Sequence, residues 1–195
     1  MLRIVLRTFL SPHVTPAHFV HPHNHVPHFP GCVGHVDTFP VRAYQGPGLY
    51  SGKYGMPVYK FQVTCTNLGA IAEVSGPYKG AKNDTKIFRA SQPQLPPGAY
   101  LLADKAYISV PHLLPPIKEN NARYTMVEIE EFNRIHGHYR SRVEHCVRTF
   151  KAGGCLAERW RSHDTKKLHR AVKVLGNIRS MYVARRVPYP PHNPQ

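Results

Sequence analysis

The order of secondary-structure signals along the chain is the feature that most limits its fold. Short apolar runs alternate with turn residues over the first half, a pattern typical of β-strands. Residues 32–39 form the first candidate strand, which carries Asp37 near its end, and residues 58–66 form the second. A turn at residues 67–69 leads into a third run over residues 70–75, so we expect an antiparallel meander.

A short helix and a fourth strand are predicted next. Asn83 or Asp84 can cap a helix that continues to Ala90, because either side chain can accept from the free backbone N–H groups of a first turn. After a proline-rich loop, residues 99–103 form a short apolar run, which is typical of a strand buried on both faces. This strand delivers Asp104 at its carboxyl end, where an acid can reach a cleft.

The longest periodic segment runs from about Glu128 to Lys151. Apolar residues recur there at steps of three and four, which predicts an amphipathic helix with one apolar stripe. Gly137 lies within this segment, and glycine weakens a helix interior, so a kink or a division into two helices is an alternative. A second amphipathic segment over residues 168–183 is expected to pack on the same body.

One domain with two irregular ends is expected. At 195 residues the chain is long enough for one substantial core and too short for two comfortable domains. We expect a disordered lead-in rich in proline and histidine over residues 1–31, one domain over residues 32–184, and a disordered tail over residues 185–195. Arg3 and Arg7 interrupt the apolar start of the chain, so neither a signal peptide nor a membrane span is expected.

The charge balance points to a polyanionic partner. Lysine and arginine total 26 against 11 acidic residues, which gives a net charge of +15. Nucleic acid is the favoured partner and a merely basic protein is the alternative, because net charge reports on partners rather than on fold. The four cysteines form no CxxC pair, which argues against a structural zinc site and favours reduced thiols.

Three acids are distributed so that they could act together on a phosphodiester bond. Such a reaction needs an activated oxygen nucleophile, a stabilised anionic transition state and help for the leaving alkoxide, which two divalent cations on carboxylate ligands supply. Asp37 and Asp104 each follow a buried run, and Glu144 lies on the long helix. The spacing also allows a plainer interpretation, in which both aspartates form turns and Glu144 pairs with Arg148.

Several short motifs, taken in order, give the chain a resemblance to one family. Each motif is a weak signal alone, but their shared order over residues 32–162 is specific. They are Val36-Asp37-Thr38, Tyr50-Ser51-Gly52-Lys53, Phe61-Gln62-Val63, the stretch from Val74 to Asp84, Ile87-Phe88-Arg89-Ala90-Ser91, Leu95-Pro96-Pro97-Gly98, Leu101-Leu102-Ala103-Asp104-Lys105-Ala106-Tyr107, Phe132-Asn133-Arg134, Arg140, Arg142-Val143-Glu144-His145 and Phe150-Lys151. Together they resemble the nuclease domain of the Harbinger-type (PIF/Harbinger) DDE transposases.

The resemblance implies a fold, an activity and a set of site residues. The fold would be α/β, an RNase-H-like mixed sheet flanked by helices, with Asp37 and Asp104 side by side on the first and fourth strands. Asp37, Asp104 and Glu144 would be the catalytic residues and the ligands of Mg²⁺ or Mn²⁺ in an endonuclease that cuts DNA. The residues implied to contact nucleic acid are Lys105, Arg142 and Lys151. Asp84 matches a further acid of the family, with helix capping or support of the metal ligands as its two roles.

Departures from the family pattern leave a catalytically inactive, DNA-binding remnant of a transposon as the alternative function. Thr38 and Ala106 stand where the family usually has glycine, and a positive φ at Ala106 would cost about 1 kcal/mol. The helix-turn-helix region that such transposases commonly carry is not recognised, which favours a fragment, a domesticated remnant or a separate DNA-binding partner protein. The expected substrate implies residence in the nucleus. A protein-interaction module acting on an acidic partner is a third, weaker class.

Overall fold

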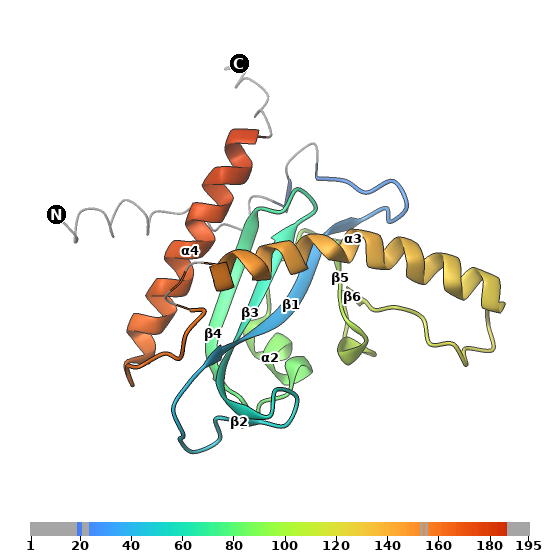
Figure 1. The fold of residues 1–195 in the computed structure, drawn as a ribbon. Coiled ribbons are helices and arrows are strands. Elements are labelled where there is room, and N and C mark those ends of the chain that lie inside the picture. Colours follow the sequence, from blue (N-terminus) through green and yellow to red (C-terminus); the bar gives the residue numbers. More distant parts are fainter. Residues whose placement is uncertain (1–18, 21–23, 153, 155, 187–195) are drawn as a thin grey trace.

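The computed structural model describes residues 19–20, 24–152, 154 and 156–186, which form one mixed sheet with helices on both faces (Figure 1). In chain order the elements are β1 (Cys32–Arg42), β2 (Tyr50–Ser51), β3 (Met56–Thr66), β4 (Ile71–Lys79), α2 (Asp84–Ser91), β5 (Tyr100–Leu102), the 3-10 helix η2 (Lys105–Tyr107), β6 (Leu113–Leu114), α3 (Met126–Ala152) and α4 (Thr165–Arg186). The described strands form one sheet with the main path β2-β3-β1-β5-β6, and β4 also pairs with β3.

The long strands β1, β3 and β4 form the predicted meander. β1 runs antiparallel to β3, with Asp37 opposite Val63, and β3 runs antiparallel to β4. Phe61 and Val63 are fully buried, because β3 lies between two strands and is covered on both faces. The predicted turn after β3 is present, and Gly69 in it takes a φ of +85°, which glycine adopts without steric cost.

A parallel pair of strands completes the sheet. β5 lies parallel to β1, with His35 opposite Leu102, and β6 lies parallel to β5 on its far side. β5 ends at Leu102, whereas β1 continues to Arg42 with β3 as its partner. In the described part of the chain, one edge of β1 therefore has no strand beside it from Val36 onward.

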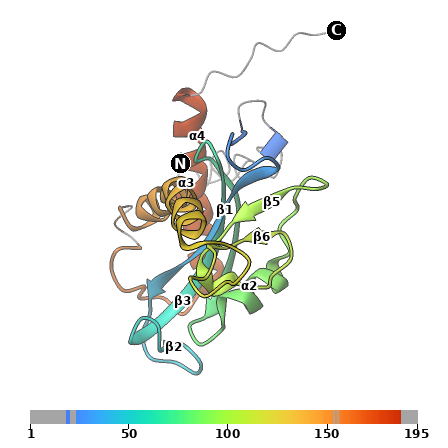
Figure 2. The same ribbon diagram turned by 90° about the vertical axis from the view of Figure 1, so that its right-hand side faces the viewer.

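Helices cover the two faces of the sheet, and alternate residues of β1 serve the two sides, as strand geometry requires. Phe39 points toward α3 and α4, where it packs in a core cluster with Phe150 and Leu168. The rings of Phe39 and Phe150 stack with their centroids 4.7 Å apart. Val36 points the other way, into a cluster with Phe88 of α2. Figure 2 shows α3 and α2 on opposite sides of the sheet.

Both helical predictions in the second half are confirmed, and α3 is one continuous helix of 27 residues. The alternative of a division at Gly137 is wrong. Residues on both sides of that glycine, from Ile129 to Phe150, pack on the same body, so tertiary contacts outweigh the weak helix propensity of one glycine. At the start of α2, Asn83 is the cap, because its side chain accepts from the backbone N–H of Thr85 at 2.8 Å.

Three strands extend further than predicted: β3 begins two residues earlier, at Met56, and β1 and β4 end later. β1 passes through Pro40 to Arg42, and β4 passes through Gly76 and Pro77, which are joined by a cis peptide bond. Proline is tolerated in a strand where no neighbour needs its missing N–H. Pro40 meets this condition because the edge of β1 opposite β3 is unpaired there.

The packed body begins before the expected boundary at residue 32. Val26 and Phe29 are buried in a cluster with Leu102, and the side chain of Asn24 hydrogen-bonds the backbone of β1 and of the turn after β3. The described residues 24–31 therefore belong to the domain, and the prediction of a disordered lead-in is wrong for them. Most of the rest of the expected lead-in, and most of the expected tail, lie outside the described residues.

The mixed sheet with helices on both faces is an α/β, RNase H-like arrangement. The fold class predicted from the sequence is confirmed. The order of its strands places the parallel pair next to the antiparallel meander. No helix in the described part of the chain has the length and apolar character needed to cross a membrane.

Candidate active site

Asp37 and Asp104 lie at the same level of the sheet. His35 is opposite Leu102 in the parallel register of β1 and β5, and each aspartate follows two residues later. Asp37 is in the middle of β1, so the prediction that it lies near the end of its strand is wrong. The strand end that forms the site is that of β5, which stops before Asp104 and uncovers the edge of β1.

Each carboxylate is held by the backbone of the residue that follows it. Oδ1 of Asp37 accepts from the N–H of Thr38 at 2.7 Å, and Oδ1 of Asp104 accepts from the N–H of Lys105 at 2.6 Å. Asp104 is thereby the N-cap of η2. Ala106 lies within η2 and is not among the described non-glycine residues with positive φ, so the strain considered for this position does not arise.

Arg140 of α3 bridges the two carboxylates. Its guanidinium lies 3.4 Å from Oδ2 of Asp37 and 3.9 Å from Oδ1 of Asp104. The side chains of Arg140 and Asp37 are 16% and 20% exposed, and that of Asp104 is 33% exposed. Arg140 was not among the site residues predicted from the sequence. The signal that could have found it is its position one helical turn before Glu144.

Arg140 compensates only part of the cost of burying the Asp37 carboxylate. Burial raises the pKa of the Asp37 carboxyl above its ordinary value, and the neighbouring Arg140 lowers it only in part, because desolvation penalises the charged form. The carboxylate of Asp104 raises the pKa of Asp37 further. An additional cation at this point would therefore stabilise the ionised form of Asp37.

Glu144 lies one helical turn beyond Arg140 and is exposed. It belongs to α3, which lies on the face of the sheet toward which Asp37 points, as the pair between Arg140 and Asp37 establishes. A pair between Glu144 and Arg148 is not among the ion pairs of the described residues. Within that part of the chain, no group of three or more His, Cys, Asp or Glu side chains is close enough to hold a metal ion. Asp37 and Asp104 are thus brought together, whereas Glu144 lies one helical turn along α3 from Arg140, the residue that contacts them.

A second charged cluster surrounds Asp84. This buried carboxylate pairs with Lys60 at 3.2 Å and with Lys53 at 3.3 Å. Lys60 is also buried, and its ammonium donates to the carbonyl oxygen of Lys82 at 2.9 Å. Of the two roles expected for Asp84, helix capping is wrong, because Asn83 performs it and both oxygens of Asp84 accept from lysine.

The three residues predicted to contact nucleic acid have different surroundings. Lys105 is exposed and directly follows Asp104. Lys151 is exposed at the end of α3 and lines a cavity of about 280 Å³ together with Arg42 of β1. Arg142 instead donates to the carbonyl oxygen of Asn67 and lies over the ring of Tyr139, so its guanidinium fastens α3 to the turn after β3.

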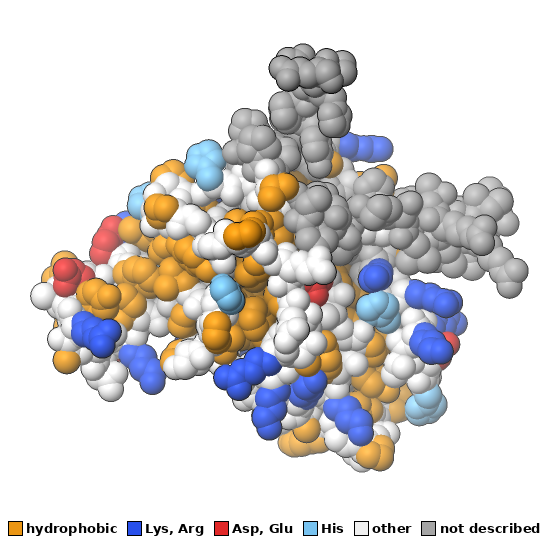
Figure 3. Space-filling view, turned by 180° about the vertical axis from the view of Figure 1, so that it is seen from behind, with side chains coloured by type: hydrophobic (Ala, Val, Ile, Leu, Met, Phe, Trp, Pro, Cys, Tyr) orange, Lys and Arg blue, Asp and Glu red, His pale blue; other side chains and the backbone are white. Residues whose placement is uncertain are grey.

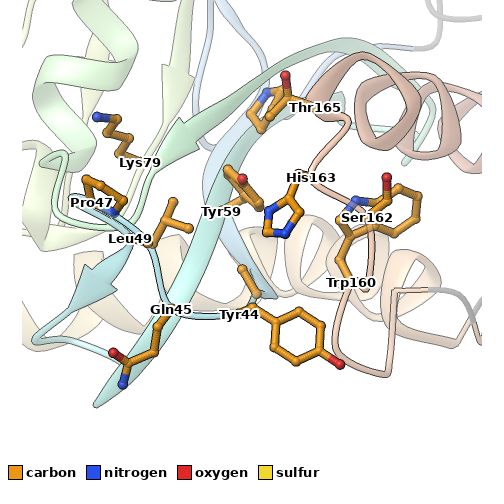
Figure 4. Close-up of a pocket in the computed structure, with 13 residues that line it drawn as sticks. Tyr44, Gln45, Pro47, Leu49, Tyr59, Lys79, Trp160, Ser162, His163 and Thr165 are labelled. Carbon is orange, nitrogen blue, oxygen red and sulfur yellow. The ribbon is translucent and has the colours of Figure 1, made fainter.

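A separate cavity of about 390 Å³ lies beyond the end of β1. In Figure 4, the imidazole of His163 lies between Tyr59 and the indole of Trp160, with Tyr44 below them. Trp160 is the one tryptophan of the chain, and it was not among the residues predicted to form a site. None of the three predicted acids lines this cavity, so it is distinct from the site around Asp37.

The surface of the described residues reflects the positive net charge of the chain. Seen from behind the view of Figure 1, lysine and arginine side chains gather toward the lower part of the molecule, while few acidic side chains are visible (Figure 3). A surface of this kind attracts polyanions over a distance of about one Debye length.

The chain combines an RNase H-like sheet with two acids at one level of neighbouring strands, under a long helix. The family model described as DDE superfamily endonuclease matches residues 37–177, more than half of the 195 residues. The chain therefore belongs to the DDE superfamily endonucleases, and the expected DDE domain is confirmed at that level. Neither the curated proteins nor the solved structures compared with the chain gave a match.

Proposed function

We propose that this chain is a metal-dependent DNA endonuclease derived from a transposase, with Asp37, Asp104 and Glu144 as its catalytic carboxylates. The observation that carries the proposal is the approach of Asp37 and Asp104, far apart in the chain, to one guanidinium of α3. Carboxylates gathered on a positively charged protein fit a reaction at the phosphate backbone of DNA.

The carboxylates of the site have the chemistry that a divalent metal ion requires. Oxygen ligands from carboxylates are those that Mg²⁺ and Mn²⁺ prefer, and the raised pKa of Asp37 marks a carboxylate that Arg140 satisfies only in part. Asp37 and Asp104 would hold the metal, and Glu144 would complete the ligands from α3. A bound metal would activate the attacking oxygen and stabilise the charge that develops on the phosphate and the leaving oxygen.

The residues around the metal ligands have roles that follow from their positions. The backbone N–H groups of Thr38 and Lys105 orient one oxygen of each aspartate, which leaves Oδ2 of Asp104 free of any hydrogen bond in the described structure. Lys105 and Lys151 are exposed lysines that would bind phosphates of the DNA strand. Arg140 would act as an internal cation beside both aspartates, and it lowers the pKa of Asp37 before the metal binds.

Nicking of supercoiled plasmid DNA tests the proposal. The wild-type protein should convert supercoiled to open-circular DNA in the presence of Mg²⁺ or Mn²⁺ and not in EDTA. Asp104→Asn should abolish this conversion while DNA binding is kept, because Asn cannot supply a charged ligand. Asp164→Asn, a change of an exposed aspartate before α4, is the matched control. The proposal would be contradicted if none of the divalent metals tested allowed the wild-type protein to nick the plasmid.

The second candidate function is a DNA-binding remnant of a transposon that no longer cuts. The contact between Arg140 and both aspartates favours it, because a guanidinium there already neutralises charge that a metal would otherwise neutralise. Binding of duplex DNA that weakens steeply with salt, together with no nicking under any metal, would select this function over the first.

Finer assignments belong to the same proposal. Harbinger-type ancestry accounts for the ordered motifs from Val36 to Lys151. Residence in the nucleus follows from a DNA substrate, and a separate DNA-binding protein is proposed as the partner that selects the target. Localisation of a tagged full chain, and co-purification with a sequence-specific DNA-binding protein, would test these two assignments.

A further inference from the structure

We propose that Lys53 is a phosphate-binding residue at the edge of the acid site, where it would hold a backbone phosphate of the DNA strand. The residues that surround its ammonium group are Asp84, Lys60 and Tyr54. The identity of the ligand rests on the proposed function, whereas this arrangement of residues is a property of the fold.

The charges around Asp84 do not balance. One carboxylate faces two ammonium groups, from Lys60 at 3.2 Å and Lys53 at 3.3 Å. The side chain of Lys60 is 6% exposed and that of Lys53 is 48% exposed. Because a buried ammonium group must be paired, Lys60 is the permanent partner of Asp84. The positive charge of Lys53 is therefore in excess and accessible to solvent.

The position of Lys53 is set by a tight turn. Lys53 lies between β2 and β3, where the N–H groups of Tyr54 and Gly55 both donate to the carbonyl oxygen of Ser51. The ring of Tyr54 has the ammonium of Lys53 at 5.6 Å and that of Lys60 at 6.0 Å from its centroid. Aromatic rings attract cations at such distances, so the exposed ammonium is held on a short and constrained support.

This support stands close to the acids of the proposed site. Burial lowers the pKa of Lys53, but Asp84, Tyr54 and Asp37 together outweigh burial and leave that pKa above its ordinary value. The buried phenol of Tyr107 feels the same acids: burial raises its pKa most, and Asp84, Asp37 and Asp104 raise it further. Geometry links the two groups as well: Phe88 of α2, the helix that begins at Asp84, packs edge-on against Tyr107 of η2, the helix that Asp104 caps, with ring centroids 6.2 Å apart.

A DNA strand is the ligand that fits a surplus ammonium beside two carboxylates. The scissile phosphate would lie at the acids, and phosphates of neighbouring nucleotides need positive partners along the strand. A lysine ammonium binds phosphate oxygen as a compact point charge. An acidic peptide would also meet Lys53, but it would be repelled by Asp37 and Asp104, whereas DNA brings its phosphates to them together with metal ions.

Salt-dependent DNA binding in EDTA tests the proposal without any catalysis. The anisotropy of a fluorescent duplex is measured with the full chain and its variants Lys53→Met, Lys53→Arg and Lys86→Met. Lys86 is an exposed lysine on α2 that makes no ion pair in the described structure, so it is the matched control. Thermal unfolding of each variant is followed in parallel by circular dichroism.

We expect Lys53→Met to weaken binding roughly fivefold at 0.15 M salt and to reduce the slope of log K against log salt by about 0.9. Lys53→Arg should restore the slope, and Lys86→Met should change it less than half as much. Lys53→Met should remain folded, because Lys60 alone neutralises Asp84.

Three results would overturn the proposal. Equal losses for Lys53→Met and Lys86→Met would make Lys53 an ordinary surface charge. A lower melting temperature with an unchanged slope, or failure of Lys53→Met to fold, would make Lys53 a structural partner of Asp84. An equal dependence of polyglutamate binding on Lys53 would show a general polyanion surface. Absence of nicking by the wild type, with the effect of Lys53 intact, would end the proposed endonuclease function and leave the phosphate site standing.

Discussion

The guanidinium of Arg140 lies 3.4 Å from the carboxylate of Asp37. This contact fastens the middle of α3 to the uncovered edge of β1, and it places the only described ion pair between those two elements inside the proposed active site. The same guanidinium reaches Asp104 at 3.9 Å. A divalent metal ion bound as proposed would therefore compete with Arg140 for the same two carboxylates, and this competition can be measured.

Arg140→Gln should distinguish the effect of the Arg140 guanidinium from that of a bound metal ion. Without metal, we expect a loss of about 1–2 kcal/mol in the free energy of unfolding, because Asp37 loses a charged hydrogen-bond donor and Asp104 loses its ion-pair partner. The pKa of Asp37 should rise further, since Arg140 is the group that lowers it most. Added Mn²⁺ should then stabilise the variant more than the wild type, as a ligand that binds only the folded form does. Thermal unfolding over a series of Mn²⁺ concentrations measures both effects.

The control for this change is Arg134→Gln, on the same helix. Arg134 pairs with Glu131 on the surface, and pairs of that kind contribute little to stability. A response to Mn²⁺ that is the same in Arg140→Gln, Arg134→Gln and the wild type would contradict the competition between Arg140 and the metal.

Glu144→Gln should reduce metal-dependent nicking roughly a hundredfold or more, because a neutral amide cannot take the place of a charged metal ligand. Since Glu144 is exposed and has no ion pair in the described structure, the melting temperature should stay within about 2 °C of the wild type. Glu130→Gln, another exposed glutamate of α3, should nick like the wild type. If Glu144→Gln nicked at the wild-type rate, Glu144 would not be a metal ligand.

Asp84→Asn should destabilise the fold by roughly 3 kcal/mol. The change leaves the buried ammonium of Lys60 with the carbonyl oxygen of Lys82 as its main remaining partner. Urea unfolding gives the free energy. The double variant Asp84→Leu with Lys60→Met should recover much of the loss, because it removes both buried charges. A single variant as stable as the wild type would mean that the ion pair is not needed for folding.

His35 should make the stability depend on pH. Burial, followed by the nearby Arg142 and Arg140, lowers the pKa of His35 to about 3, whereas in the unfolded chain it is about 6.5. The unfolded state therefore binds more protons between these values. The contribution of neutral His35 is complete above pH 6.5 and is lost as the pH falls toward 3, by up to about 1.4 kcal/mol per pH unit.

The pH effect of His35 can be isolated by comparing variants. His35→Leu should flatten the decline of the unfolding free energy between pH 6.5 and pH 4, measured by urea unfolding at several pH values. His145→Gln, a change of an exposed histidine on α3, should leave the decline unchanged. Equal slopes for His35→Leu and the wild type would contradict a buried neutral His35.

Local patterns were sufficient to predict most elements of the fold. Apolar alternation gave β3 and the first residues of β4, and steps of three and four gave α3 and α4. These patterns reflect which face of one element is buried, so they are readable within a short window. The ordered motifs predicted that Asp37 and Asp104 lie side by side. The parallel register of β1 and β5 places them at the same level of the sheet.

The features that the sequence did not predict depend on contacts between distant segments. The length of β1 depends on where β5 ends, because Pro40 is tolerated only on an unpaired edge. Asp84 looked like a helix cap because nothing near it in the chain shows that Lys60 is buried beside it. The bridge from Arg140 to Asp37 spans 103 positions, which no local pattern reveals.

The backbone tethers of the two aspartates have a consequence for which side chains the site can accept. Oδ1 of each aspartate accepts from the backbone N–H of the next residue. The local backbone therefore sets the orientation of the carboxylate, whichever cation binds it. Glutamate, longer by one methylene, would lose that anchor and overshoot. The geometry of the site is therefore prepared in advance, and exchanging Arg140 for a metal would require little rearrangement of the aspartates themselves.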